Sequence, residues 1–275
     1  MQLDANRVAI VTGASRGIGR AIVIALAQAG VRIVAAARSR EELAALAAEV
    51  ERQGSECIAA TCDVGSWPEV AAAVQQALDR FGRIDIVVNN AGFGSYAPFL
   101  DADLQEFHEL MRVNYFGSVY VTRAALPAML REGGGHLVFV ASVAGRIASP
   151  RHTGYSPTKF ALVGFAESIA YELRPHKIGV TIVNPGIVDT DFFNRESFKD
   201  FPEGARKMMI TAEAVARATI EAIKRDRSEV YVPRSLRYAH TLKVLAPSLF
   251  RAFSMRYARK HGMIPPILVP PARPA

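Results

Sequence analysis

Short apolar runs and longer segments with helical spacing alternate along most of this chain. Residues 7–12 are a β-branched apolar run of the kind that forms a buried strand. Ile18, Ile22 and Leu26 then recur at helical spacing, which predicts a helix that ends at Gly30. The alternation continues, and the further runs that predict strands are 31–36, 56–61, 84–88, 136–140, 179–183 and 230–232.

This alternation defines the expected fold class. Strands that alternate with helices form parallel sheets, because each helical crossover returns the chain across one face of the sheet. The sequence therefore predicts an α/β protein with a single Rossmann-type, doubly wound parallel sheet of about seven strands and helices on both faces. Half of the 275 residues are hydrophobic, which is enough for one sizeable core.

A glycine-rich turn lies between the first predicted strand and the first predicted helix. Gly13, Gly17 and Gly19 follow the strand directly, within a strand–helix–strand unit of about thirty residues. Glycine lets the backbone approach a phosphate closely, and the helix N-terminus offers N–H donors and the positive end of the helix dipole. The turn therefore predicts a phosphate-binding site, and the alternative is a tight structural turn.

Three side chains beyond the fifth predicted strand offer acid–base chemistry. Ser142 lies just past the end of that strand, where the active sites of open α/β sheets are found. Tyr155 and Lys159 are four residues apart, so in a helix they share one face. A lysine charge beside a phenol lowers the phenol pKa and lets it exchange a proton near neutral pH. The alternative for this pair alone is an ordinary helix surface.

The composition excludes several classes of protein. Cys57 and Cys62 are the only cysteines, and no histidine cluster lies near them. We therefore expect no disulfide framework, no metal site and a reducing compartment. The N-terminus lacks the layout of a signal peptide, and no window of about 18 residues is apolar enough to span a bilayer. These features favour a cytoplasmic protein.

The positive charge is concentrated near the C-terminus. The net charge is +7, but residues 224–275 alone hold eleven Lys and Arg against two acidic residues. Leu245, Leu249 and Phe253 recur there at helical spacing, and Pro247 predicts a split into two helices. Such a basic amphipathic segment can dock on an anionic membrane, or it can pack on the body, at a substrate mouth or on a partner subunit. Nucleic acid is not expected, because no aromatic–basic reading motif is present.

Several motifs together resemble the short-chain dehydrogenase/reductase (SDR) family. Residues 12–19 read TGASRGIG, which differs in glycine spacing from the common dinucleotide fingerprint and matches the cofactor loop of this family. Residues 89–92 read NNAG, the second signature of the family. Ser142, Tyr155, Lys159, and a Pro185-Gly186 turn followed by Thr190 complete the set. The resemblance covers residues 7 to about 232, and the motifs together are highly specific.

The resemblance implies a nicotinamide cofactor. Where NAD-binding units place an acidic residue for the ribose 2′-hydroxyl, this chain has Ala37. Arg38 follows, and Arg16 lies in the glycine loop. Two guanidiniums without a carboxylate favour a 2′-phosphate, and so NADP(H) over NAD(H); the alternative is two solvated arginines.

Other cofactor contacts follow from the family pattern. An Asp after the third strand, here Asp63, contacts the adenine in this family, and the NNAG tetrapeptide borders the cofactor. The expected cofactor-binding residues are Gly13, Ser15, Arg16, Gly17, Ile18, Gly19, Arg38, Asp63, Val64, Asn90, Ala91, Gly92, Tyr155, Lys159, Pro185, Gly186 and Thr190.

The resemblance also implies hydride transfer between the nicotinamide and a carbonyl or alcohol. Ser142 would hold the substrate oxygen, Tyr155 would act as general acid or base, and Lys159 would keep the tyrosine pKa low and hold the nicotinamide ribose. Asn114 would hold a water that links Lys159 to solvent, and its alternative is a plain core amide. Two further functions stay open: a catalytically idle NADP-binding sensor or scaffold, and an SDR-type epimerase or dehydratase.

Residues 187–210 are too long for a plain connection, and in this family such an insert forms a lid over the substrate. Aromatic and methionine side chains suit an apolar, adaptable pocket. We therefore expect a fairly large hydrophobic substrate: a fatty, steroid-like or terpenoid carbonyl or alcohol. The alternative is that these side chains merely pack the lid onto the body. They are Phe192, Phe193, Phe198, Phe201, Met208 and Met209.

The chain is expected to form one domain with an extension. Residues 1–233 would be the NADP-binding catalytic domain, including the lid, and residues 234–275 a basic amphipathic helical extension of it. The prolines after residue 264 predict an extended tail. Because the family often pairs through the helices that hold Asn114 and Tyr155, a homodimer or homotetramer is expected. Residues 235–261 could also make peripheral contact with a membrane.

Overall fold

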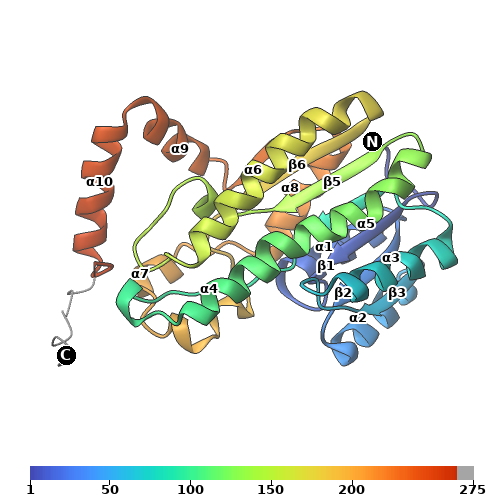
Figure 1. The fold of residues 1–275 in the computed structure, drawn as a ribbon, viewed down its shortest axis with the longest axis horizontal. Coiled ribbons are helices and arrows are strands. Elements are labelled where there is room, and N and C mark those ends of the chain that lie inside the picture. Colours follow the sequence, from blue (N-terminus) through green and yellow to red (C-terminus); the bar gives the residue numbers. More distant parts are fainter. Residues whose placement is uncertain (265–275) are drawn as a thin grey trace, which may run out of the picture.

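The computed structural model describes residues 1–264, and the tail predicted for residues 265–275 lies outside them. Seven parallel strands form a sheet in the order β3-β2-β1-β4-β5-β6-β7 (Figure 1). The predicted doubly wound α/β fold is therefore confirmed. The strands are β1 (Val8–Thr12), β2 (Arg32–Ala37), β3 (Cys57–Thr61), β4 (Ile86–Asn89), β5 (Gly135–Val140), β6 (Ile178–Pro185) and β7 (Glu229–Val232).

Helices connect the strands and cover both faces of the sheet (Figure 1). Short 3-10 turns lie between several of them, at Phe99–Asp101, Val143–Gly145, Arg174–His176, Asp191–Phe193 and Glu196–Phe198. The α-helices are α1 (Gly17–Gln28), α2 (Arg40–Arg52), α3 (Trp67–Phe81), α4 (Leu104–Met111), α5 (Gly117–Arg131), α6 (Tyr155–Leu173), α7 (Glu203–Arg206), α8 (Ala212–Lys224), α9 (Leu236–Leu245) and α10 (Pro247–Lys260).

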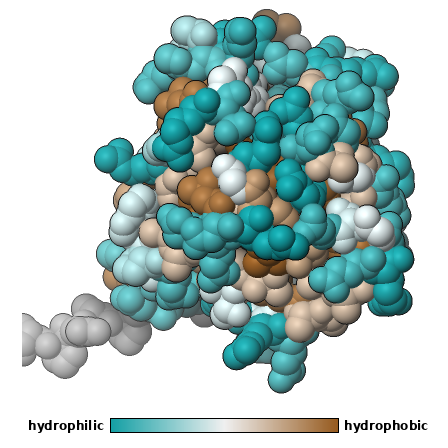
Figure 2. All heavy atoms as spheres, turned by 90° about the vertical axis from the view of Figure 1, so that its right-hand side faces the viewer, coloured by the Kyte–Doolittle hydropathy of each residue, from teal (hydrophilic) through white to brown (hydrophobic). Residues whose placement is uncertain are grey.

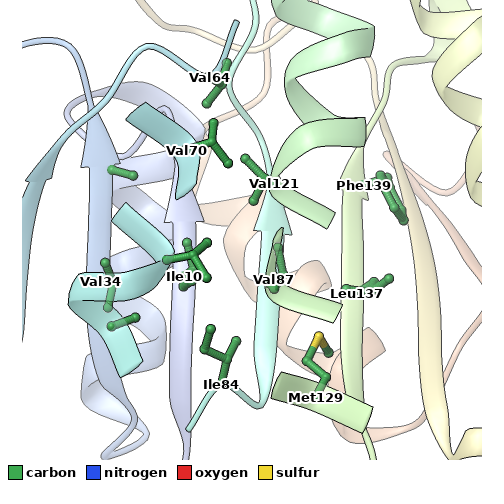
Figure 3. Close-up of a cluster of buried hydrophobic side chains, with 14 of the residues drawn as sticks. Ile10, Val34, Val64, Val70, Ile84, Val87, Val121, Met129, Leu137 and Phe139 are labelled. Atoms are coloured by element: carbon green, nitrogen blue, oxygen red, sulfur yellow. The ribbon is translucent and has the colours of Figure 1, made fainter. Parts of the chain in front are cut away.

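One apolar core lies between the sheet and helices α3, α5 and α6. Val70 of α3 and Val121 of α5 pack there with Ile10 and Leu137, which come from the strands (Figure 3). The second core, between the opposite face and helices α1, α2 and α8, includes Leu26. Each Leu or Ile that is fully buried in these cores contributes about 1.5–3 kcal/mol to folding. The strands are apolar on both faces for this reason, which is why they read as continuous hydrophobic runs.

The strand order reverses at the centre of the sheet. From β1 the chain proceeds outward to β2 and β3, and it then returns to place β4 on the other side of β1. The loops that follow β1 and β4 therefore diverge and leave a crevice at the carboxyl ends of these strands. Open α/β sheets bind their ligands at such a reversal.

The long helix expected around Asn114 contains a local irregularity. Asp103 caps the N-terminus of helix α4, and its carboxylate accepts a hydrogen bond of 2.9 Å from the backbone N–H of Gln105. The chain then passes through a π-helical turn at Arg112–Phe116 and continues as α5. Asn114 lies inside this turn and is fully buried. A π-turn in a helix frequently marks a functional position.

The C-terminal segment forms two helices, α9 and α10, with the break at Pro247 that the sequence predicts. They lie at one end of the molecule, and α10 runs along its outer edge (Figure 1). A hydrogen bond of 2.9 Å between the Tyr231 hydroxyl and His240 Nδ1 joins α9 to β7. No helix within residues 1–264 has both the length and the apolar character needed to cross a membrane.

Candidate active site

A cleft of about 640 Å³ opens at the carboxyl ends of the central strands. Its walls come from the loops after β1, β2, β3, β4 and β5, from the start of α6 and from the segment after β6. Most of the site residues expected from the sequence line this cleft. They are Gly13, Ser15, Arg16, Gly17, Ile18, Arg38, Asp63, Val64, Asn90, Ala91, Gly92, Tyr155, Lys159 and Thr190.

Five expected site residues do not line the cleft: Gly19, Asn114, Ser142, Pro185 and Gly186. A Cβ atom on Gly19 would lie 2.1 Å from the carbonyl oxygen of Gly13, so this glycine allows α1 to pack closely on the loop. Pro185 ends β6, and the N–H of Gly186 donates a hydrogen bond of 2.8 Å to Val232. Pro185 and Gly186 thus fix the carboxyl end of β6, and the chain that follows them forms part of the cleft wall.

The glycine loop is locked to the tetrapeptide that follows β4. Gly13 has a φ of +61°, which favours glycine. The side chain of Asn90 donates hydrogen bonds to the carbonyl oxygens of Thr12, at 2.9 Å, and of Gly13, at 3.2 Å. In return, the Thr12 hydroxyl accepts hydrogen bonds from the backbone N–H groups of Asn90 and Ala91. These bonds fix the backbone of the loop before any ligand binds.

The first turn of α1 faces the cleft with its backbone N–H groups available. No side chain caps the helix at Arg16, and its first turn has no acidic residue. Gly17 and Ile18 of this turn line the cleft. A helix N-terminus of this kind favours the phosphate of a dinucleotide, so the residues present fit a nicotinamide dinucleotide.

Arg16 and Arg38 are exposed at the same end of the cleft, and Ala37 lies beside Arg38 in the lining. Within residues 1–264 neither guanidinium forms an ion pair. Asp63 also lines the cleft, and its carboxylate pairs with Arg112 at 3.0 Å. The carboxylate expected at the adenine end is thus held by a neighbouring cation.

Tyr155 and Lys159 lie at the other end of the cleft, on the first turns of α6. Burial raises the pKa of Tyr155 to about 12, against the lowering effect of a hydrogen bond with Ser142. Burial also lowers the pKa of Lys159 to about 8. The Lys159 ammonium lies 5.9 Å from the centre of the Tyr155 ring and donates a hydrogen bond of 2.9 Å to Val140.

The expected lowering of the tyrosine pKa by Lys159 is therefore wrong for this structure. The helical spacing places both side chains on one face, as expected, but both are nearly inaccessible to solvent. Desolvation disfavours the charged form of each group and is the largest cause of both shifts. Tyr155 is thus a neutral phenol at neutral pH.

The Asn114 side chain is fully engaged by its neighbours. Its oxygen accepts a hydrogen bond of 2.9 Å from the N–H of Phe93, and its nitrogen donates to the Phe93 carbonyl at 2.9 Å and to Thr158 at 3.0 Å. A Cβ on Gly92 would lie 2.9 Å from the Asn114 oxygen and 3.6 Å from the Lys159 nitrogen. Asn114 therefore fixes the backbone next to Lys159, although no direct hydrogen bond joins these two side chains in the described part of the chain.

The expected lid is a closed loop. Backbone hydrogen bonds of 2.9 Å join Ile210 to Ile187 and Asp189 to Ile210, so both ends of the segment meet. Phe192 lines the cleft, with its ring centre 5.6 Å from that of Tyr155. Phe198 is fully buried away from the cleft, in a cluster with Tyr96, Phe201 and Ala205.

The aromatic residues of the lid therefore divide between the two expected roles. Phe192 borders the space beside Tyr155, whereas Phe198 and Phe201 pack the lid onto Tyr96. Met208 is 58% exposed and contributes to neither role.

The sequence did not mark several of the lining residues, among them Phe93 and Arg195. Phe93 follows the NNAG tetrapeptide directly, and its ring lies 4.5 Å below the guanidinium of Arg195. Arg195 reaches the cleft from the lid and also pairs with Glu106 of α4 at 3.5 Å. Phe93 could have been inferred from its neighbours in the sequence, but no local pattern marks Arg195.

A glycine loop at the strand reversal and a buried Ser–Tyr–Lys group beside it define a class of α/β oxidoreductases that use nicotinamide cofactors. Comparison with known protein families gives the same class. Residues 7–200 match the family model described as "short chain dehydrogenase", and this chain belongs to that family.

Individual relatives cover most of the chain. The 3-oxoacyl-[acyl-carrier-protein] reductase of Synechocystis is 35% identical over 230 residues, which are 82% of this chain and 92% of the relative. An alcohol dehydrogenase from Thermococcus sibiricus, complexed with 5-hydroxy-NADP, superposes with a TM-score of 0.74 at 32% identity and covers 82% of this chain and 95% of its own. A 7α-hydroxysteroid dehydrogenase complexed with NADH and 7-oxo-glycochenodeoxycholic acid has a TM-score of 0.78 at 27% identity, with 85% and 94% covered.

Proposed function

We propose that this chain is an NADP(H)-dependent oxidoreductase that interconverts a carbonyl and an alcohol, with Tyr155 as the general acid or base. One observation carries the proposal: Tyr155 and Lys159 line the same cleft as the glycine loop. A proton donor and a dinucleotide site in one cleft are what such a reaction requires.

The cofactor would lie along the cleft between the glycine loop and α6. Gly17 and Ile18 at the start of α1 would hold the diphosphate, and Asn90 would keep the loop in shape. Thr190 and Lys159 would border the nicotinamide end. When bound, the nicotinamide supplies or accepts the hydride.

The chain's own residues would bind the substrate oxygen and transfer a proton to or from it. The Ser142 hydroxyl, which shares a hydrogen bond with Tyr155, would bind the substrate oxygen and place it against the phenol. A phenol with its pKa raised to about 12 carries its proton at neutral pH. Tyr155 would therefore donate that proton to the oxygen of a carbonyl as it is reduced, which leaves a phenolate; in the reverse direction that phenolate would take the proton of the alcohol. Lys159, with its pKa lowered to about 8, would exchange protons readily near neutral pH.

The preference for NADP(H) is supported by Arg16 and Arg38, which line the cleft and have no acidic partner among residues 1–264. Fluorescence titration with NADPH and NADH tests it directly: we expect NADPH to bind at least about tenfold more tightly. Arg38→Leu should remove most of this difference, whereas Arg40→Leu, on an exposed side chain outside the cleft, should not. Equal or reversed affinities for the two cofactors would overturn the assignment to NADP(H).

A hydrophobic substrate is supported by the rings at the reacting end of the cleft. Phe192 offers apolar surface beside Tyr155, and Phe93 lines the same cleft. The related hydroxysteroid dehydrogenase holds a large ligand, 7-oxo-glycochenodeoxycholic acid. We therefore propose a fatty, steroid-like or terpenoid carbonyl or alcohol. A substrate panel in which small polar ketones react best would contradict this.

Loss of carbonyl substrate in step with the appearance of NADP+ would separate net oxidoreduction from epimerase or dehydratase chemistry and from an idle sensor or scaffold.

We also propose that residues 1–233 form the catalytic domain, that residues 234–275 form an extension of it, and that the chain assembles as a homodimer or homotetramer.

A further inference from the structure

Helices α9 and α10 carry a row of exposed apolar side chains that the break at Ala246 divides between them. Its members are spaced three or four residues apart, so they follow one side of each helix. They are 36% to 78% exposed, although each is large and apolar. We call this row the C-terminal stripe: Tyr238, Leu242, Leu245, Leu249, Phe253 and Tyr257.

Other sides of the same two helices already hold them to the body. On α9, Lys243 donates a hydrogen bond of 2.5 Å to the carbonyl oxygen of Arg146 and lies over the ring of Phe160. On α10, Ala258 is buried, and His261 just beyond the helix lies close to Gly204 of α7. The C-terminal stripe is therefore not the face with which the helices attach to their own domain.

The charged side chains of the two helices themselves have a single sign. No acidic residue follows Glu229 in the sequence. Within residues 1–264 none of the basic side chains of the two helices forms an ion pair. These side chains are Arg237, Lys243, Arg251, Arg256, Arg259 and Lys260.

We propose that the C-terminal stripe docks on the surface of an anionic lipid bilayer. Leu245, Leu249 and Phe253 would enter the headgroup region, while arginines and lysines around them would contact lipid phosphates and carboxylates. A row of apolar side chains among unpaired cations matches this surface in both polarity and charge.

The same charges argue against a second copy of the chain as the partner that covers the C-terminal stripe. In a two-fold dimer the same surface meets itself, so the cations of the two helices would face those of the second copy, and neither pair of helices carries an acidic residue to offset them. Helix α10 lies at the outer edge of the molecule, where a flat membrane surface could approach it (Figure 1). The end that faces the viewer in Figure 2, remote from α10, is covered mainly by hydrophilic residues around a few apolar patches.

Vesicle flotation of the full chain tests the proposal. Vesicles of phosphatidylcholine with about 30% phosphatidylserine should carry at least about tenfold more protein than vesicles of phosphatidylcholine alone. This difference should largely vanish when the salt concentration rises from about 0.1 M to about 0.5 M. Binding to neither kind of vesicle, or equal binding to both, would overturn the proposal.

Two matched variants locate the contact. The double variant Leu249→Ser/Phe253→Ser should lower binding to the anionic vesicles at least about fivefold. Tyr171→Ser, at a residue of α6 that is 83% exposed and lies off the stripe, should bind like the unaltered protein. Unchanged binding of the double variant would refute the role of the stripe. If the double variant instead separates a dimer into monomers, and the unaltered protein ignores vesicles, a second copy occupies the stripe and the proposal fails.

Discussion

The ammonium of Lys159 donates a hydrogen bond of 2.9 Å to the carbonyl oxygen of Val140, the last residue of β5. This bond ties the first turns of α6 to the strand end from which Ser142 follows. It also holds a charged group that is only 4% exposed, and burial lowers the pKa of Lys159 to about 8. The stability of the fold should therefore depend on the protonation of this one lysine.

Replacement of Lys159 by Met should remove part of the pH dependence of stability. The unfolded lysine has a pKa near 10.5 and the folded one about 8, so between these values the unfolded state binds more protons and stability rises with pH. The unaltered protein should gain up to about 3 kcal/mol from this group between pH 8 and pH 10.5.

Urea unfolding at several pH values within this range measures the gain as the difference between the variant and the unaltered protein, because the buried thiols of Cys57 and Cys62 lower stability in the same range in both. Lys159→Met should lack it, whereas Lys224→Met, at an exposed lysine of α8, should keep it. The same pH slope in Lys159→Met and in the unaltered protein would contradict the burial of a titrating lysine.

Removal of the Tyr155 hydroxyl should abolish turnover and spare cofactor binding. Tyr155→Phe keeps the ring that packs against Phe192 but loses the proton, so we expect kcat to fall by roughly 10²–10⁴-fold. The affinity for NADPH, measured by fluorescence, should change little. Tyr96→Phe, at a buried tyrosine of the lid cluster, is the control and should retain most of the activity. Normal turnover by Tyr155→Phe would contradict the proposed role of Tyr155 as the general acid or base.

A methyl group at Gly19 should disturb the glycine loop. The added Cβ would lie 2.1 Å from the Gly13 carbonyl oxygen and 2.5 Å from the Asn90 amide nitrogen, so the loop would have to shift. We expect Gly19→Ala to weaken NADPH binding at least about tenfold, as judged by titration.

Gly164→Ala provides the comparison, because that glycine lies in α6 with no atom within 4 Å of the added Cβ. It should leave binding unchanged and stabilise the protein by about 0.5–1 kcal/mol. Equal affinities in both variants would mean that the loop tolerates the methyl group.

A smaller side chain at Phe192 should affect the substrate more than the cofactor. Because its ring borders the space beside Tyr155, Phe192→Ala should raise the KM for apolar carbonyls about tenfold or more. Met208→Ala, at an exposed residue of the same lid, should leave the KM unchanged. The measurement is a steady-state comparison across a panel of carbonyl chain lengths, and an unchanged panel profile would exclude Phe192 from the substrate contact.

The fold could be predicted because buried parallel strands and amphipathic helices leave strong local patterns. Runs such as 7–12 and 136–140 correspond closely to β1 and β5. The glycine loop and Asn90 could be placed in one cleft for a related reason, since both follow strands whose carboxyl ends share an edge of the sheet.

The features of the site that the sequence could not predict depend on which side chains are buried in the folded chain. The spacing of Tyr155 and Lys159 is visible in the sequence, but the desolvation that decides both pKa values is not. The residue types of Phe192 and Phe198 are identical, yet one borders the cleft and the other is buried in the lid. Arg195 reaches the cleft only because the lid folds back over it.

The π-helical turn at Arg112–Phe116 holds one residue more than an α-turn. Because the extra residue is taken up within a single turn, the residues on either side keep the faces that a regular helix would give them. Deletion of a single residue there would let a regular helix form and would leave Val121 and Ala125 in the core. The same deletion would remove Asn114 from its hydrogen bonds with the backbone of Phe93. In the descent of such a protein, one codon gained or lost at this place would alter the site and spare the core.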